Sequence, residues 1–278
     1  MALIAILLAL FLDRYASSLA EWRRWEWFFR YCDWMQRRFS LRSIPGVLFL
    51  LFWPLLLAAW LYHWFAGVWL LDLLVSTAIL FYSLGPLNLR RQVALWQEMS
   101  ARGDLQGSYR VALAIRQGEV AESREGIEQA VVEGILLQAN ERLLAVLFWF
   151  VVLGPVGALL YRMSFLTECW AGREYAGHDL ARAAQRLHDI LAWVPARLCA
   201  LSFALSGNFV GALSHWADKT AMIRDHYTRI LLACGRGAMT GTHPGQGGPV
   251  DEVLSLVFRA EVIWIVVLAL MTLGGWIR

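Results

Sequence analysis

Charged residues are scarce in this sequence, and lysine is almost absent. Only 17% of the 278 residues are charged, against about 25% in an ordinary soluble domain. Lys219 is the single lysine, so nearly all of the positive charge comes from arginine. The net charge is only +3, and no basic segment carries the dense charge or the aromatic signatures of nucleic-acid-binding modules. We therefore expect no nucleic-acid partner.

The motifs of metal and nucleotide sites are also missing. The four cysteines, Cys32, Cys169, Cys199 and Cys234, lie far apart without CxxC spacing, which indicates neither a zinc site nor a redox motif. We interpret them as small buried apolar residues. No GxxxxGK[ST] segment occurs, which excludes a P-loop. The glycine-rich stretch 235–249 contains no lysine, and we interpret it as a flexible loop. We expect no metal and no cofactor.

Hydrophobic residues are abundant. They make up 59% of the chain, the mean hydropathy is +0.50, and soluble domains reach only about 45–50%. Many of the 15 tryptophans lie near the ends of apolar runs, as in the aromatic belts of membrane proteins. We predict an all-α, polytopic membrane protein. Its first residues lack a basic region and a cleavage site, so we interpret them as a retained helix.

The apolar runs predict about four to six membrane segments within a single domain of residues 1–278. Between them lie two polar regions that we expect in the cytoplasm. The predicted membrane segments are 1–20, 44–64, 68–85, 143–171 and 262–277, with 190–207 as a marginal or re-entrant segment and 86–141 and 208–259 as the polar regions.

Residues 21–42 have the composition of an amphipathic helix. Six arginines and three acidic residues alternate there with four tryptophans and three phenylalanines. Such a helix lies in the membrane surface, with its aromatic side toward lipid and its arginines toward anionic headgroups. Because arginine-rich segments stay on the cytoplasmic side, we expect this helix there.

The longest apolar stretch, residues 143–172, is broken at residues 154–157 and carries two charges, Arg162 and Glu168. A helix of this length would span about 45 Å, against a hydrocarbon core of about 30 Å. Two interpretations remain, namely one long tilted helix kinked at Pro155 or a re-entrant hairpin of two shorter helices. We favour the hairpin because the two charges then need not cross. Charges at membrane depth face a protein interior or a wet cavity, unless both side chains reach the headgroups.

Four motifs between residues 126 and 198 occur in an order that resembles a known family. They are a glycine-isoleucine pair leading to Glu133, the LFW run at 147–149, the Gly-Ala…Tyr-Arg run at 157–162, and RLHDILAWVPARL at 186–198. Together they resemble the membrane family of adenosylcobinamide-phosphate synthases of the cobalamin pathway (CobD/CbiB). The last run is similar to that family's RLDDxLNxxPARL motif.

The acidic motifs of that family are altered in this chain. After Glu133, the positions of the family's EN…DG pattern are occupied by Leu137-Gln138 and Glu141-Arg142. The family's NTLDSM becomes FLTECW at residues 165–170. Within these two altered motifs, only the positions at 141 and 168 keep an acid, as glutamate in place of aspartate.

Further along, Asp189 is the only member retained of the second aspartate pair, with His188 in place of the other, and Ala192 replaces an asparagine. The family's HxSPNAG motif and its N-terminal aspartate-rich GDP motif are absent. A ligase that couples an amine to a carboxylate with nucleotide and metal needs fixed carboxylates and phosphate-binding groups. The departures therefore imply that the synthase activity is lost.

A sister branch, the AmpE proteins, resembles the chain over nearly its whole length, including LFLDR near the N-terminus and LAWVPARLCAL at 191–201. This resemblance implies a multi-pass protein of the bacterial inner (cytoplasmic) membrane. It also implies a role in peptidoglycan-recycling signalling and in the regulation of β-lactamase induction in response to β-lactam antibiotics. The partners that it implies are membrane lipid, a muropeptide-type or nucleotide ligand and a protein of the induction pathway, and a homo-oligomer is compatible with it.

We predict a signalling or sensor module whose ligand site consists of the polar residues that remain at matched positions. Arginines there would bind a carboxylate or phosphate. In a purely structural alternative, Arg162 pairs with Glu168, and residues 195–197 begin a helix. The predicted ligand-binding residues are Glu133, Tyr161, Arg162, Glu168, Asp189 and Arg197.

A membrane enzyme and a transporter are the alternatives to the sensor. In a membrane enzyme of the same ligase type acting on another substrate, Glu133, Glu141, Glu168 and Asp189 would bind a divalent metal, because glutamate can replace aspartate as an oxygen ligand. A transporter is disfavoured because the two halves of the chain show no inverted repeat.

Overall fold

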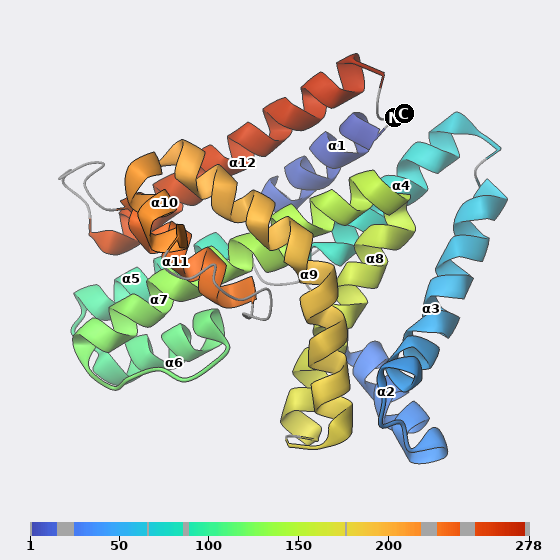
Figure 1. Cartoon of the computed structure of the whole chain (residues 1–278), viewed down its shortest axis with the longest axis horizontal. Coiled ribbons are helices and arrows are strands. Elements are labelled where there is room, and N and C mark those ends of the chain that lie inside the picture. The colour runs from blue at the N-terminus through green and yellow to red at the C-terminus, as the bar shows by residue number, and fades with distance from the viewer. Residues whose placement is uncertain are drawn as a thin grey trace. The chain divides into compact units, whose positions relative to one another are not determined.

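The computed structural model describes residues 2–15, 25–65, 67–85, 89–175, 177–217, 227–239 and 248–275, and every regular element in these ranges is a helix (Figure 1). Within them, four helices are long and apolar enough to cross a membrane. The prediction of an all-α, polytopic membrane protein is thereby confirmed. These four helices span Ile44–Phe65, Arg124–Glu174, Asp179–Ser206 and Pro249–Leu273.

The chain folds into two compact units, each assembled from separate stretches of sequence. The first contains Met1–Pro86, Glu141–Trp193 and Ala269–Arg278, and the second contains Leu87–Asn140 and Val194–Leu268. The second unit therefore takes up nearly all of the two polar regions that separate the apolar runs.

In the first unit, α4 (Trp69–Ser83) packs against both α1 (Ala2–Tyr15) and α8 (Ala145–Glu174), and α3 (Ile44–Phe65) contacts α4 and α8. Large apolar side chains along α3 remain exposed, among them Phe52 and Trp60. This exposure suits a helix that faces lipid, because soluble monomers rarely expose such a row of large apolar side chains.

The predicted amphipathic segment forms α2 (Glu26–Phe39), while residues 21–24 lie outside the described residues. Phe28, Cys32 and Met35 share one face of α2 at helical spacing and are buried in the core of the first unit. That core also contains Trp170, whose indole Nε1 donates to Asp33 Oδ1 at 2.8 Å. The apolar face of α2 thus packs on protein, while Trp34 remains exposed.

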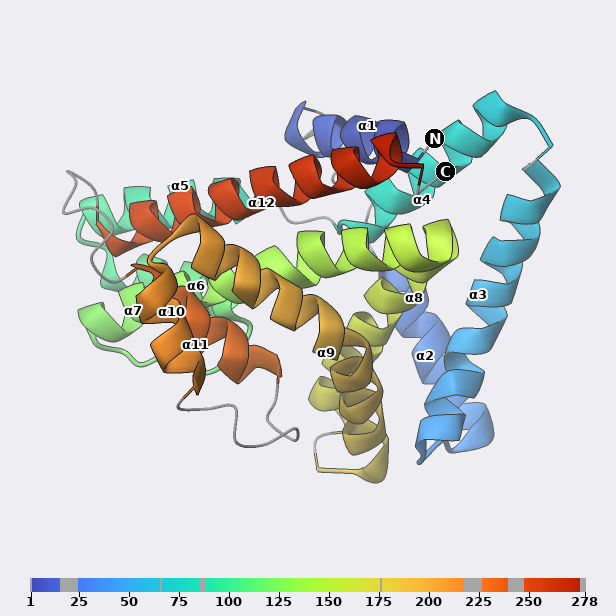
Figure 2. The same ribbon diagram turned by 45° about the horizontal axis from the view of Figure 1, so that its top comes forward.

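The central segment consists of two helical parts joined at a kink, which both interpretations predicted, but the break lies at Gly154 and not at Pro155. Gly154 has φ 70° and ψ −161°, a conformation that side chains do not tolerate. Pro155 follows as the first residue of the next helical segment, where its missing N–H is no loss. Figure 2 shows the ribbon of α8 turning sharply between its two segments.

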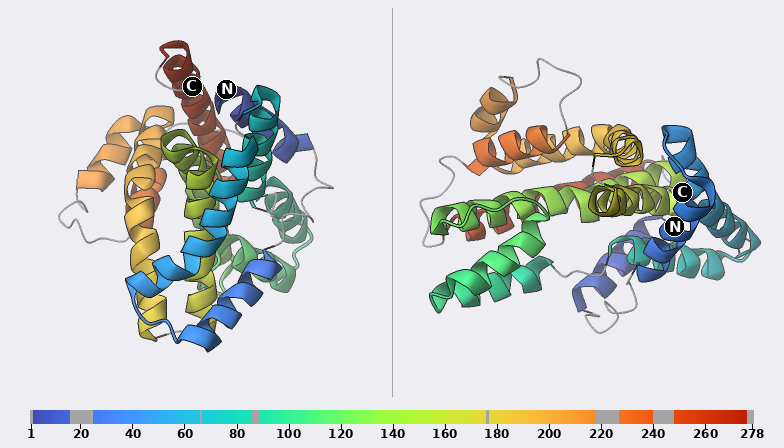
Figure 3. Two further views of the ribbon diagram at one scale, coloured as in Figure 1. Left: turned by 90° about the vertical axis from the view of Figure 1, so that its right-hand side faces the viewer. Right: turned by 90° about the horizontal axis from the view of Figure 1, so that it is seen from below.

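In the second unit, α5 (Leu89–Ala101), α6 (Leu105–Arg116) and α7 (Arg124–Gln138) pack in succession. The turns between them end in N-caps, since Asp104 accepts from Gly107 N and Ser123 accepts from Gly126 N. Another pair of helices, α10 (Phe209–Ala217) and α11 (Tyr227–Met239), packs closely in the same unit. Figure 3 shows α6 and α7 side by side in green in its right-hand view.

Two more helices complete the second unit. The helix α9 (Asp179–Ser206) contributes its C-terminal part, and α12 (Pro249–Leu273) contributes most of its length. Trp264 of α12 donates its Nε1 to Ser202 Oγ of α9 at 2.8 Å. The predicted glycine-rich loop lies largely outside the described residues, since residues 240–247 belong to the gaps and α11 extends to Met239.

Three of the four cysteines are buried, as expected for small apolar residues, whereas Cys169 is only partly buried. Cys32, Cys199 and Cys234 are buried, and burial raises the pKa of the Cys234 thiol to about 11 and that of Cys32 further still. An ordinary thiol with pKa near 8.5 is about 3% thiolate at pH 7, whereas at pKa 11 the fraction falls to about 0.01%. Only the thiolate reacts with maleimide or disulfides.

We therefore expect Cys32 and Cys234 to resist maleimide at pH 7 in the folded protein and to react fully in dodecyl sulfate. Mass spectrometry of the labelled peptides measures both states. A Glu119→Cys variant provides the positive control, because Glu119 lies in the exposed turn between α6 and α7. Labelling of Cys234 in the folded protein as fast as that of the control cysteine would contradict the expectation.

Candidate functional site

A cluster of polar side chains is buried in the first unit, where α8 and α9 meet the π-helical turn η2 (Ala139–Leu144). Glu141 is 4% exposed, and Tyr161 and His188 are fully buried. Tyr161, Ser164 and Glu168 lie three to seven residues apart on one side of α8. The longest helix among the described residues thus presents a polar stripe to α9 and η2.

One carboxylate oxygen lies at the centre of this cluster. Glu141 Oε2 accepts a hydrogen bond from the Tyr161 hydroxyl at 2.8 Å, and His188 Nε2 lies 3.1 Å from the same oxygen. Glu168 Oε2 lies 3.8 Å from His188 Nε2. Glu168 is also the member that reaches the surface, since its side chain is 22% exposed.

The hydrogen bonds of Ser164 fix the protonation of one histidine nitrogen. Ser164 Oγ donates its only proton to the Tyr161 backbone carbonyl at 2.7 Å. His188 Nδ1 lies 3.1 Å from the same hydroxyl, so Nδ1 must carry a proton and donate it. One further proton then lies between His188 Nε2 and Glu141 Oε2, whether the pair is an imidazolium with a carboxylate or a neutral imidazole with a carboxylic acid. The cluster therefore holds a proton in a fully enclosed position.

Glu141 occupies this position within a π-helical turn. Such turns insert an extra residue into an α-helix and are frequent at functional sites. The insertion changes the angular register between the side chains of α7 and those of α8.

Arg162 is buried beside the cluster but packs in another direction. Its guanidinium lies against Gly85, at a point where any side chain at position 85 would collide with it. The guanidinium carbon also lies 5.3 Å from the centre of the Phe165 ring, within cation–π range. Arg162 thus links the end of α4 to α8.

Two of the predicted ligand-binding residues, Glu133 and Arg197, belong to the second unit. Glu133 is engaged there by arginines of two other helices, with Arg116 Nε at 3.0 Å from Oε2 and Arg236 bonded to Oε1. Partial burial lowers the pKa of Arg116, which nevertheless remains charged. Arg197 lies on the second-unit part of α9.

The structure thus brings together Tyr161 and Glu168 of the predicted set, with Asp189 next to His188 on α9. The sequence predicts Glu141 only as a metal ligand, marks His188 only as a substitution, and does not single out Ser164. The spacing of Tyr161, Ser164 and Glu168 on one helix side was the available signal. Nothing in the sequence connected that side to position 188.

The metal alternative receives no geometric support from the part of the chain described. Among these residues, no group of three or more His, Cys, Asp or Glu side chains is arranged so that it could hold a metal ion. Of the four glutamate and aspartate residues considered, Glu133 is already bonded to two arginines. Glu141 is bonded to Tyr161 and His188.

Known proteins resemble this chain over most of its length. The family model described as CobD/Cbib protein matches residues 6–235. The cobalamin biosynthesis protein CobD of Stutzerimonas stutzeri is 31% identical over 249 residues, covering 81% of this chain and 79% of that protein. CobD of Chromobacterium violaceum is 30% identical over 204 residues, covering 73% and 64%. Protein AmpE of Shigella flexneri is 25% identical over 245 residues, covering 84% and 79%. No solved structure matches.

Proposed function

The chain belongs to the CobD/CbiB protein family, and on this premise we propose that it is a non-catalytic member that senses a ligand at the membrane. The pathway that we propose is signalling linked to peptidoglycan recycling and to the regulation of β-lactamase induction. Similarity to AmpE over 84% of the chain supports this branch of the family. The proposed ligand is a muropeptide-type molecule or a nucleotide, and the proposed partner is a protein of the induction pathway.

The observation that carries this proposal is that the polar groups at or beside the motif positions, two of them substituted relative to the family pattern, bond to one another. Glu141 accepts from Tyr161 and shares a proton with His188, and His188 donates to Ser164. A general acid or base must instead be within reach of a proton on the substrate. Apart from the partly exposed Glu168, these groups are enclosed and bond to one another within the protein.

The altered motif positions are occupied by residues that pack and fasten helices. Leu137 is 9% exposed, where the resemblance places an acid. Gln138 donates its amide to the Ile115 carbonyl and so fastens α7 to α6. Both side chains serve packing at places where the synthase pattern supplies oxygen ligands, which supports loss of the nucleotide-dependent ligation.

Glu168 is the group through which a ligand would reach the buried cluster. Its carboxylate lies 3.8 Å from His188 Nε2 and is the only partly exposed member of the set. A cationic or hydrogen-bonding group that contacts Glu168 would change the charge felt by the Glu141–His188 pair. A sensor needs such a differential interaction between two states.

We further propose the inner (cytoplasmic) membrane as the location, with residues 86–141 and 208–259 on the cytoplasmic side. The helix α2 supports this side, because it carries three arginines, Arg30, Arg37 and Arg38, shortly before the start of α3. The described helices are compatible with the proposed segments 1–20, 44–64, 68–85, 143–171 and 262–277 and with the marginal segment 190–207.

A ligand titration of the detergent-purified protein tests the proposal. A ligand that binds only the native state adds about 2.7 kcal/mol of stability at a hundred times its Kd. We expect anhydro-muropeptides to raise Tm in a concentration-dependent manner, and we expect the chain not to restore cobalamin synthesis in a strain lacking CobD. The Stutzerimonas stutzeri relative is the matched control in the complementation. Rescue by this chain would contradict the proposal.

The alternative is a membrane ligase acting on a different substrate. Its support is the identity of 31% and 30% to two CobD proteins, together with two carboxylates that face one histidine nitrogen. The same titration separates the two functions. A rise of Tm that requires both nucleotide and Mg²⁺ would favour the ligase, and a rise with muropeptide alone would favour the sensor.

A further inference from the structure

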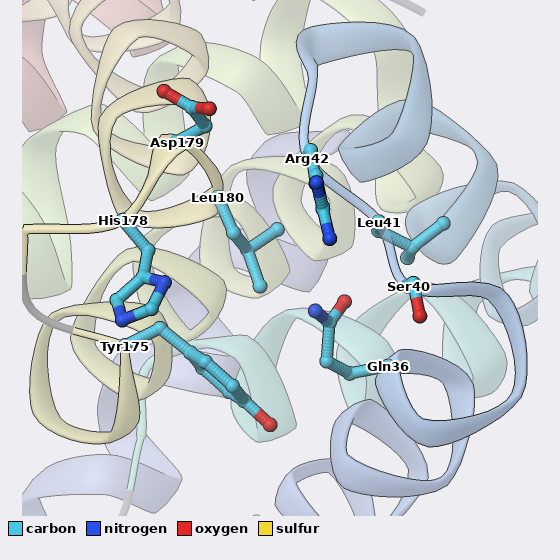
Figure 4. A pocket seen from close by; sticks show the side chains of 8 residues that line it. All are labelled: Gln36, Ser40, Leu41, Arg42, Tyr175, His178, Asp179 and Leu180. Atoms are coloured by element: carbon cyan, nitrogen blue, oxygen red, sulfur yellow. The ribbon is translucent and has the colours of Figure 1, made fainter.

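A second polar site lies at the surface of the first unit, apart from the Glu141–His188 cluster. It is a cavity of about 350 Å³, which is within the range of small-molecule sites. One wall comes from the end of α2 and the turn after it, and the other comes from the connection between α8 and α9 (Figure 4). The lining residues are Gln36, Ser40, Leu41, Arg42, Tyr175, His178, Asp179 and Leu180.

The cavity combines an apolar floor with a basic rim. Leu41 and Leu180 are buried, while Arg42 and His178 are exposed. In Figure 4 the Arg42 guanidinium points into the space above Gln36, and His178 stands on the facing wall. Asp179 is the only acidic residue of the lining, and its carboxylate is bonded to Arg182 at 2.5 Å. The arrangement therefore favours an anion.

The side chain of Gln36 requires a hydrogen-bond donor from the molecule that occupies the cavity. Its side-chain Oε1 is buried and has no hydrogen-bond partner within the described ranges. A buried acceptor without a donor is unfavourable, so such atoms are nearly always satisfied by protein, water or ligand. The occupant that fits this cavity carries an anionic group and, beside it, a hydroxyl or ammonium group.

The cavity lies at the level where three candidate membrane helices end. Arg42 comes two residues before α3 begins at Ile44, Tyr175 directly follows α8, and Asp179 is the first residue of α9. The ends of spanning helices lie near the boundary of the hydrocarbon core, where phosphate headgroups are found. Exposed Phe39 and Phe49, with ring centres 5.4 Å apart, offer an apolar surface for acyl chains beside it.

The turn that forms one wall is held by a conformation that is unusual for its residue. Ser40 adopts the left-handed region with φ 47°, and its amide donates to the Gln36 carbonyl at 2.9 Å. Such a conformation is uncommon outside glycine, asparagine and aspartate. It ends α2 and directs Leu41 and Arg42 to the cavity.

We propose that this cavity binds the headgroup of a membrane phospholipid. Arg42 and His178 bind the phosphate, and a hydroxyl or ammonium group of the headgroup donates to Gln36 Oε1. The site takes phosphatidylglycerol or phosphatidylethanolamine, since the choline headgroup carries no hydrogen-bond donor. A soluble phosphoester presents the same phosphate chemistry, and the experiment separates the two sources.

The test is native mass spectrometry of the full-length protein in detergent with short-chain phosphatidylglycerol, phosphatidylethanolamine or phosphatidylcholine. We expect the first two to bind about tenfold more tightly than the third, as one hydrogen bond to a buried acceptor allows. Arg42→Gln should weaken binding of all three by about tenfold or more. Gln36→Leu should remove the preference over phosphatidylcholine.

The control is Arg38→Gln. It also removes one positive charge, but at an exposed position of α2 that does not line the cavity. Equal binding by the Arg42→Gln and Arg38→Gln proteins would overturn the site, as would the absence of any lipid preference in the unmodified protein. Glycerol 3-phosphate is added as the soluble competitor. Displacement of bound phosphatidylglycerol at equal concentration would overturn the lipid assignment, and displacement only at large excess would support it.

Discussion

Replacing Glu141 by leucine should lower the free energy of unfolding by about 3–5 kcal/mol, the loss expected when one partner of a buried charged pair is removed. The Tyr161 hydroxyl and His188 Nε2 both bond to Glu141 Oε2, at 2.8 Å and 3.1 Å. Leucine leaves both groups buried without that acceptor. Because both side chains are fully buried, water cannot replace the lost hydrogen bonds as it does at a surface ion pair.

The measurement is reversible unfolding in mixed micelles with increasing dodecyl sulfate, followed by far-ultraviolet circular dichroism. Glu168→Gln is the matched control, because Glu168 is partly exposed and lies 3.8 Å from the same nitrogen. We expect this control to lose at most about 1 kcal/mol, in the range of exposed pairs. A Glu141→Leu protein as stable as the control would show that the cluster is not a unit of the fold.

Replacing Gly154 by alanine should destabilise the protein by about 1–3 kcal/mol through the backbone alone. At φ 70° and ψ −161°, Gly154 occupies a region that is essentially restricted to glycine. A Cβ at this position would meet no atom within 4 Å, so a steric collision adds nothing to the effect. The variant must either bear the strain or straighten α8 at the cost of its packing.

Pro155→Ala separates the two residues of the kink. Because Pro155 begins a helical segment, alanine fits there, and the expected loss is at most about 1 kcal/mol from the more flexible unfolded chain. Thermal unfolding in detergent gives both values. A larger loss for Pro155→Ala than for Gly154→Ala would assign the kink to the proline after all.

The features that could be predicted from the sequence are those encoded locally. The amphipathic pattern before residue 42 gave α2, because Phe28, Cys32 and Met35 recur at helical spacing. A Gly-Pro step inside an apolar run gave the kink, although the choice between its two residues required the dihedral angles. The assignment to membrane proteins followed from the amino-acid composition alone, which does not depend on how the chain packs.

The site could be predicted only in part because its contacts join distant segments. Glu141 and His188 are 47 residues apart, and Glu133 and Arg236 are 103 apart. On a straight α-helix, positions 133 and 141 would differ by only about 80° around the axis. Motif matching therefore grouped Glu133 and Glu141 in one predicted site. In the structure, a π-helical turn follows Glu133, and its carboxylate is bonded to Arg116 and Arg236, whereas Glu141 belongs to the buried cluster.

The short length of α4 has a consequence for the surrounding lipid. Its 15 residues span about 22 Å, roughly 8 Å less than a typical hydrocarbon core. As a membrane segment, it must thin the bilayer or draw flanking residues inward, and this hydrophobic mismatch varies with acyl-chain length. Gly85, two residues beyond α4, lies against the guanidinium of Arg162. We therefore expect bilayer thickness to act through this contact on α8, the helix that carries Tyr161, Ser164 and Glu168.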